Sequence, residues 1–448
     1  MFIIRKIKLS YTQIIVLSTL ALIFLGAFLL ALPVSSKDGN YTPFIDSLLT
    51  ASSSFCVTGL IVYDTYTHWS LFGQIVILTL LQTGGLGFMT IITLISMFLK
   101  RRIGLKERRL IMESANTYNI GGVVRLVRKI IRRTFIMEGA GIVILTIRFY
   151  PEMGFCEGFY NGVFHSVSAF CNAGFDLMGK YGQFSSLTRY VGDFTVNITI
   201  GSLIIIGGLG FLVWDDIIKN KTNFKEYSLH SKIVIITTIV LILAGTVFFY
   251  IFEADYSMKG LNTYERILAS FFQSVTPRTA GFNTIDQMQL SESGSLLTIF
   301  LMIIGGSPGS TAGGIKTTTM VVLIVGTIAS VKSSSYLTIF KRRLEEDSLR
   351  KACSITVLYM TTALSSVLIL CFLEEFSLKQ ILFEVFSALG TVGLTMNVTP
   401  DLSSWISKLI ISLLIYTGKV GVLSLAASLS EQKEKVHLSR PVEKILIG

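Results

Sequence analysis

Four short segments, each bearing a glycine, are the part of this chain best suited to chemistry. They are Cys56–Leu60, Asn172–Phe175, Thr279–Phe282 and Thr391–Leu394. Their glycines lie 115, 107 and 112 residues apart, so the spacing indicates one unit repeated four times. Glycine reaches positive φ and adds no side chain, which leaves the backbone carbonyl oxygens of each segment accessible.

Backbone carbonyls arranged in a ring suit a cation. A cation that sheds its water needs other oxygens, and rings of carbonyls supply them without a fixed charge. At membrane depth, irregular backbone is tolerated only where it is buried or lines water. Four equivalent loops around one axis are therefore expected to form a single central site. The predicted ion-binding residues are Val57, Thr58, Gly59, Asn172, Ala173, Gly174, Thr279, Ala280, Gly281, Thr391, Val392 and Gly393.

A short helix is predicted ahead of each segment. These stretches have about a dozen residues, too few to cross a bilayer, and cover 46–55, 158–170, 263–275 and 378–389. Pro43 starts the first helix and Asn262 caps the third. Each helix would point its partly negative C-terminal end at the central site, which favours a cation there.

Long apolar stretches surround these short helices. Hydrophobic residues make up 51% of the chain, charged residues 15%, and the mean hydropathy is +0.65. A soluble protein carries about a quarter charged residues. About eight stretches are long enough to span a bilayer, namely 11–32, 71–99, 131–149, 190–213, 233–252, 296–304 with 315–331, 353–372 and 405–429. The sequence therefore predicts an all-α integral membrane protein.

The predicted order is span, short helix, glycine loop and span, repeated four times around a pseudo-fourfold central pore. The expected units are repeat 1 (1–100), repeat 2 (101–220), repeat 3 (221–335), repeat 4 (336–430) and a cytoplasmic tail (431–448).

The distribution of charge predicts the orientation. The net charge is +11, and 28 of the 39 Lys and Arg fall in 1–10, 100–133, 215–232, 332–351 and 431–448. The loops that alternate with these segments, 33–69, 150–189, 253–293 and 373–402, hold seven Lys and Arg and fifteen Asp and Glu. This asymmetry places both termini in the cytoplasm and argues against nucleic acid as the partner. The basic stretches Lys100–Arg109 and Arg125–Arg133 either dock a partner or anionic lipid, or only orient the chain.

The predicted second spans share glycine clusters. Gly84–Phe88 recurs as Gly207–Phe211, and Gly305-Gly306 and Gly418–Gly421 stand at comparable positions. The clusters begin 25, 33, 24 and 25 residues after the loop glycines. Small residues allow close helix packing and also permit a hinge, and the sequence leaves both interpretations open.

A glycine-rich segment interrupts the second span of repeat 3. Five glycines and Pro308 within residues 305–314 cannot keep a straight helix. A phosphate-binding loop is disfavoured, because Ile315 shifts the lysine by one position and no strand precedes. We expect a flexible gate beneath the ion site. The predicted gating residues are Gly305, Gly306, Ser307, Pro308, Gly309, Ser310, Thr311, Ala312, Gly313, Gly314, Lys316 and Lys419.

Lys419 is an ionisable residue inside the last predicted span. A charge there is costly and usually functional. It either repels cations, pairs with the gate, or extends toward the membrane surface.

The motifs resemble those of the Ktr/Trk/HKT superfamily of potassium transporters, in particular the bacterial Ktr B-type pore-forming subunit. Thr276–Asn283, Asn172–Phe175, Val57–Leu60 and Thr391–Leu394 match that family's four filter segments, and the resemblance covers essentially the whole chain. It implies a pore within one chain, a homodimer, and control by a cytosolic nucleotide-binding ring on a separate subunit. No cofactor is expected in this chain itself.

The same resemblance implies the ion. Potassium-permeable members carry glycine at the filter position, whereas sodium-selective members carry serine in the first repeat. All four positions are glycine here, so potassium is the expected ion and sodium an expected activator. The family commonly has Arg where this chain has Lys419, and a lysine lacks the arginine fork.

The expected function is gated potassium uptake across the cytoplasmic membrane. The alternative is a sodium- or proton-coupled potassium symporter, since such carriers often contain broken helices. An enzyme is not expected, because the sequence offers no Ser/His/Asp set or carboxylate pair.

Overall fold

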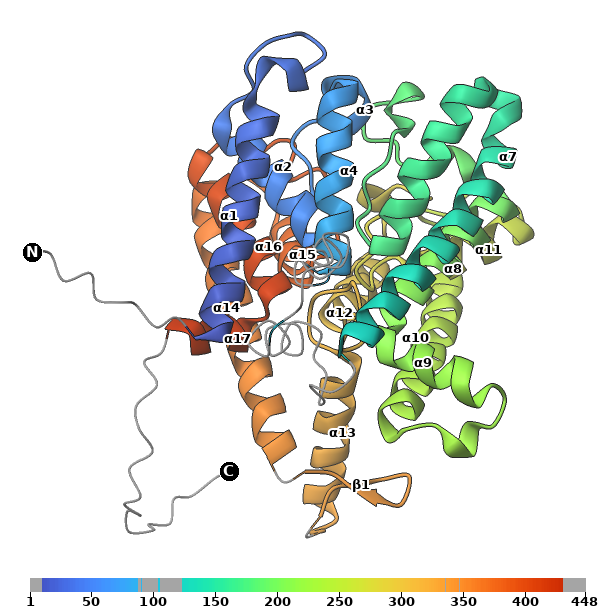
Figure 1. Ribbon diagram of the computed structural model, residues 1–448, viewed down its shortest axis with the longest axis vertical. Helices are drawn as coiled ribbons and strands as arrows, with labels where there is room; N and C mark the ends of the chain where they lie inside the picture. The colour runs from blue at the N-terminus through green and yellow to red at the C-terminus, as the bar shows by residue number, and fades with distance from the viewer. Residues whose placement is uncertain are drawn as a thin grey trace, which may run out of the picture.

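The computed structural model describes residues 10–87, 123–334, 336–345 and 347–429, together with 90 and 104. The predicted tail 431–448, the basic stretch Lys100–Arg109 and the end of the predicted span 71–99 lie outside the described residues. Within them the chain is largely helical, as predicted (Figure 1). The strands are β1 (Thr338–Ile339) and β2 (Arg342–Arg343), which pair antiparallel in one hairpin.

The first half of the described chain forms α1 (Tyr11–Ala31), η1 (Pro33–Ser35), α2 (Phe44–Cys56), α3 (Thr65–His68), α4 (Leu71–Leu86), α7 (Val123–Cys171), η2 (Met178–Lys180), η3 (Thr188–Tyr190), α8 (Phe194–Leu209) and α9 (Phe211–Asn220). The second half forms η4 (Phe224–Glu226), α10 (Leu229–Phe252), α11 (Thr263–Val275), η5 (Gln287–Gln289), α12 (Glu292–Ile303), α13 (Thr317–Val331), α14 (Asp347–Leu373), α15 (Leu378–Gly390), α16 (Trp405–Val420) and α17 (Val422–Leu429).

The four short helices are confirmed. α11 has the predicted bounds, and Asn262 caps it through a reciprocal pair with Glu265. α2 begins directly after Pro43, and α15 ends one residue beyond its predicted limit. The second short helix forms the last part of α7, separated from the first part by a break at Gly154, where φ is 77°.

About eight spans are predicted, one of them interrupted, and the structure breaks more of them than the sequence indicated. Among the described residues, α1, α10 and α14 are long and apolar enough to cross a membrane, and α8 with α9 makes a fourth if this pair, bent by 98°, is taken as one span. α4, α12 and α13 are shorter apolar helices. Glycines with φ of 83° at Gly87, 93° at Gly210 and 90° at Gly421 end α4, α8 and α16. An α-helix cannot continue through such a residue.

Of the two interpretations that the sequence left open for the glycine clusters, the structure supports close packing, and the hinge stays a prediction. In the first, second and fourth clusters the last glycine ends a helix, as just described. The first glycine of each of these three clusters packs against a short helix: a Cβ on Gly84, Gly207 or Gly418 would overlap the carbonyl oxygen of Phe55, Phe170 or Leu389. In the third predicted repeat, Gly305 instead packs against Gly313 of its own loop.

Buried acids connect the end of a long helix to the start of the next apolar helix. Glu253 follows α10 and accepts hydrogen bonds from Ser257 and Ser291, which precedes α12. Glu374 follows α14 and accepts from the backbone of Ser404, the N-cap of α16. These contacts hold each long helix against the start of the next apolar helix.

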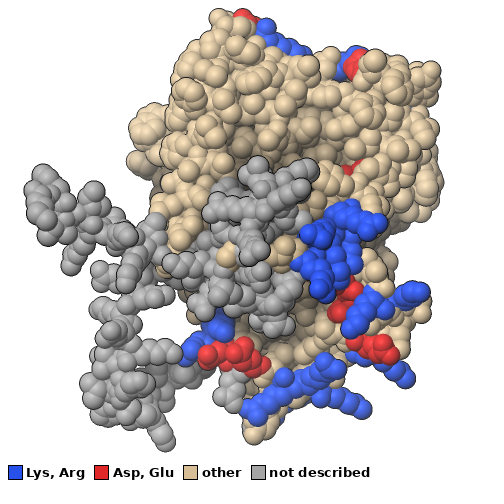
Figure 2. Space-filling view, in the orientation of Figure 1, with Lys and Arg blue, Asp and Glu red and all other residues tan. Residues whose placement is uncertain are grey.

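Charge is unevenly spread over the surface. On the face in Figure 2, most Lys and Arg gather over the lower part, beneath a broad area of other residues. Among the exposed basic residues are Arg128, Lys129 and Arg132 at the start of α7 and Lys219 near the end of α9. Asp215 pairs with Arg133 at 2.6 Å and links the two helices.

The close approach of α4 to α2 gives a test of the fold. Gly84→Ala should lower the thermal unfolding midpoint of the purified protein, because the new methyl group meets the backbone of Phe55. The expected cost is roughly 1–3 kcal/mol, typical of overpacking. Gly139→Ala in α7 is the control, since nothing lies within 4 Å of its added Cβ. Equal midpoints for the two variants would contradict this packing role.

Candidate ion-conduction site

The four loop glycines meet in a closed cycle. A Cβ added to Gly59 would lie 2.5 Å from the carbonyl oxygen of Ala173, and one on Gly174 would lie 2.7 Å from that of Ala280. A Cβ on Gly281 would lie 2.6 Å from the carbonyl oxygen of Val392, and one on Gly393 would overlap that of Thr58. The structure therefore brings the twelve predicted ion-binding residues together, with the four segments in chain order around one point.

The backbone of the four segments is held in an unusual conformation. The residue two positions before each glycine has positive φ: 59° at Val57, 61° at Asn172, 74° at Thr279 and 51° at Thr391. Three of these residues are β-branched, for which a positive φ is a clear outlier. Such a residue costs about 1–3 kcal/mol and persists only where its surroundings hold it.

Hydroxyl groups in the last turn of each short helix, or just after it, hold the segments. Ser53 Oγ accepts from the backbone nitrogen of Gly59 at 3.0 Å, and Ser387 Oγ accepts from that of Gly393 at 3.1 Å. Ser168 donates to the Phe175 carbonyl at 2.7 Å and Thr276 to the Phe282 carbonyl at 2.5 Å. The sequence analysis missed these residues, although a Ser or Thr stands five or six positions before every loop glycine.

The predicted gate lies directly against this ring. Gly313 packs on the Thr391 side chain, and Thr311 Oγ1 lies 3.3 Å from the Asn172 amide. The backbone nitrogen of Ser307 donates to the carbonyl of Gly208 in α8 at 3.0 Å. The loop ends are joined by a bond from Gly305 N to the Ile315 carbonyl at 2.9 Å. The segment is thus a defined loop, which we call the gate loop (residues 304–316).

Other predicted gate residues fix the lower part of this loop. The carbonyl of Gly309, the residue after Pro308, accepts from Phe211 N at 2.9 Å and anchors the loop to α9. Ser310 donates to the Ser307 carbonyl at 2.6 Å. Gly306, whose carbonyl accepts from Thr317 N at 3.2 Å, joins the loop to α13.

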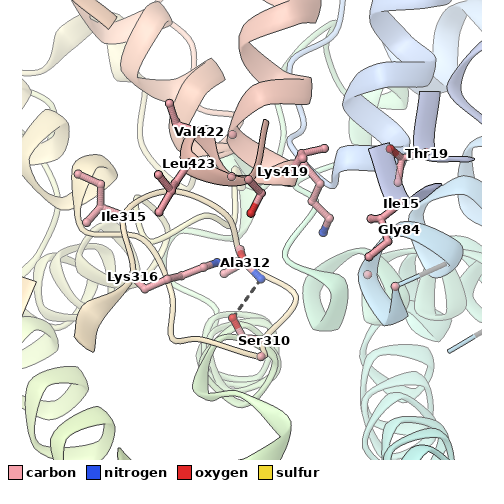
Figure 3. A pocket seen from close by; sticks show the side chains of 18 of the residues that line it. Ile15, Thr19, Gly84, Ser310, Ala312, Ile315, Lys316, Lys419, Val422 and Leu423 are labelled. Carbon is pink, nitrogen blue, oxygen red and sulfur yellow. Dashed lines mark hydrogen bonds between the residues drawn. The ribbon is translucent and has the colours of Figure 1, made fainter. Parts of the chain in front are cut away.

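Two lysines donate to successive carbonyls of the gate loop. Lys419 Nζ lies 3.0 Å from the carbonyl oxygen of Thr311, and Lys316 Nζ lies 2.5 Å from that of Ala312. Both side chains line a cavity of about 520 Å³, bounded by the gate loop, α1, α4, α16 and α17 (Figure 3). Of the three roles open for Lys419, the geometry favours pairing with the gate loop.

Two acidic residues lie on the other side of the ring, outside the spans. Asp64 accepts from the backbone nitrogen of Phe184 at 3.1 Å, joining the first two predicted repeats. Burial, together with the negative charge of Asp64, raises the pKa of Asp176 to about 7. Within the described ranges, no group of three His, Cys, Asp or Glu is arranged to hold a metal ion.

These features define the class of protein: a helical membrane protein. A profile of the TrkH family, described as cation transport protein, matches residues 8–438. The chain belongs to this family and is not an enzyme.

Curated relatives are similar to this chain over nearly its full length. The chain is 39% identical to the potassium/sodium uptake protein NtpJ of Enterococcus hirae, covering 99% of this chain and 98% of that one. It is also 39% identical to the Ktr system potassium uptake protein B of Bacillus subtilis, covering 100% and 98%. The crystal structure of the potassium transporter TrkH from Vibrio parahaemolyticus matches with a TM-score of 0.73 at 16% identity, covering 95% and 86%, and shares the fold.

The hydroxyl supports of the ring can be tested in repeat 4. Ser387→Ala removes the only described acceptor for the buried Gly393 N–H, so we expect a loss of about 1–3 kcal/mol in stability. Ser412→Ala is the matched control, because this buried hydroxyl bonds to the Lys408 carbonyl of its own helix. Thermal unfolding of both variants measures the difference, and a loss for Ser412→Ala as large as that for Ser387→Ala would refute the support role.

Proposed function

We propose that this protein carries potassium ions into the cell through the ring of loop carbonyls. The observation that carries the proposal is the closed cycle of contacts among Gly59, Gly174, Gly281 and Gly393. Uncharged carbonyl oxygens around one point can replace the water of a cation. Relatives named as potassium uptake proteins, and glycine at all four ring positions, support potassium as the ion.

The short helices contribute electrostatically to cation binding at the ring. Three of the short helices end directly before a residue with positive φ: α2 before Val57, the last part of α7 before Asn172, and α15 before Thr391. Their C-terminal ends, which carry partial negative charge, therefore lie next to the ring. The arrangement supports four span–helix–loop–span repeats around a pseudo-fourfold pore, with both termini on the cytoplasmic side.

The gate loop closes this path from below. It packs under the ring, and the ammonium groups of Lys316 and Lys419 bind its carbonyls beside the cavity. Cations in the cavity would meet two positive charges at short range, which opposes their passage. Moving the loop aside would remove both obstacles.

Assembly is proposed from the resemblance to Ktr subunits. We expect a homodimer in the cell membrane, regulated by a separate cytosolic subunit that binds nucleotide, with sodium as an activator. The relative from Enterococcus hirae is named a potassium/sodium uptake protein, which makes sodium coupling the second candidate. Potassium flux that continues without sodium favours the channel, and strict stoichiometric coupling favours the symporter.

Ion selectivity tests the ring directly. In proteoliposomes with mixed salts, the wild type should be more permeable to potassium than to sodium. Gly59→Ser places a Cβ 2.5 Å from the Ala173 carbonyl, at a φ of 101°. We expect the permeability ratio to fall about tenfold, the factor for ~1.4 kcal/mol. Gly39→Ser is the control, with a φ of 66° and open space around it. Equal permeability of the wild type to both ions would end the proposal.

The gate is tested by shortening the loop. Deleting Ser307–Gly313 removes the carbonyls that Lys316 and Lys419 bind, so potassium flux should rise severalfold. The measurement is initial uptake into proteoliposomes, normalised to folded protein by size-exclusion chromatography. A variant that folds and conducts no faster than wild type would contradict a gating role.

A further inference from the structure

Asn172 differs from its three counterparts in the ring. Val57, Thr279 and Thr391 have β-branched side chains at this position, whereas Asn172 has an amide. Asparagine also tolerates positive φ better than those residues. Its side chain is 1% exposed and therefore needs internal hydrogen-bond partners.

Those partners come from different parts of the chain. The Asn172 amide lies 3.4 Å from Thr279 Oγ1 of the third segment and 3.3 Å from Thr311 Oγ1 of the gate loop. With the amide oxygen toward α8, Thr311 donates to that oxygen and the amide nitrogen donates to Thr279. With its nitrogen toward α8, the amide instead donates its two hydrogens to the carbonyls of Ile204 at 3.2 Å and Phe170 at 3.3 Å, and Thr311 Oγ1 lies against this group.

The gate loop meets the ring at a second point as well. Gly313 packs against Thr391, and the backbone nitrogen of Thr311 donates to the Gly207 carbonyl at 3.4 Å. A displaced loop would therefore withdraw contacts from Asn172 and Thr391, two of the four residues with positive φ. Such residues keep their conformation only through their surroundings.

We propose that Asn172 couples the gate loop to the carbonyl ring, so that displacing the loop also weakens the ring's discrimination between potassium and sodium. The inference rests on the proposed function and adds a regulation of the same site. In this arrangement Thr311 is a positioning residue: it acts on the ions through Asn172 and Thr279.

Thr311→Val is the first test, since it keeps the side-chain shape and removes the hydroxyl. The full-length protein in proteoliposomes should show a potassium-to-sodium permeability ratio reduced about two- to tenfold, the factor for one buried hydrogen bond. Thr327→Val in α13 is the matched control, because that hydroxyl bonds to the Leu323 carbonyl of its own helix. It should leave the ratio unchanged.

A double-mutant cycle supplies the second test. Asn172→Gly removes the amide, and glycine adopts the positive φ of this residue without strain. As a single substitution it should reduce the potassium-to-sodium permeability ratio. If the two side chains act through one contact, adding Thr311→Val to Asn172→Gly should change nothing further.

Two results would overturn the coupling. One is a Thr311→Val protein that conducts faster but keeps the wild-type potassium-to-sodium permeability ratio. The other is a double-mutant cycle in which the effects of Thr311→Val and Asn172→Gly on this ratio are fully additive. A wild type without potassium selectivity instead overturns the proposed function.

Discussion

Backbone that leaves a helix at membrane depth has no water to bond with, and this constraint organises the molecule. Four segments leave their helices close to one another, with positive φ at each loop glycine and at the residue two positions before it. Serine and threonine hydroxyls at the ends of the short helices bond to these segments, and second-span glycines let α4, α8 and α16 approach the short helices. The carbonyl oxygens of Thr58, Ala173, Ala280 and Val392 each lie beside the glycine of a neighbouring segment.

Electrostatics divides the structure into layers. The four ring segments themselves contain no ionisable side chain apart from Cys56. Lys316 and Lys419 place positive charge next to the gate loop. Asp64 and Asp176 place carboxyl groups between predicted repeats 1 and 2.

The four units are alike in the ring and different around it. The third segment begins three residues after Thr276, the cap of α11, whereas Val57 and Thr391 cap α2 and α15 directly. In the part of the chain that the structure describes, the third unit alone carries a gate loop between its two apolar helices. In the sequence, the second segment begins with the amide Asn172 where the other three have a β-branched residue. The shared features fit ion binding, and the departures from symmetry lie where the gate loop contacts the ring.

The sequence by itself determined the short helices and the four glycine-bearing segments between them and the next apolar stretches, because glycine spacing, helix caps and apolar length are local properties of the chain. It could not determine that Gly87, Gly210 and Gly421 end their helices, since glycine is compatible with both a helix and a break. Nor could it show that Asn172 lies beside Thr311, 139 residues away, or that Lys419 donates to the carbonyl of Thr311. Contacts between distant segments depend on how whole helices pack, and only the tertiary structure decided them.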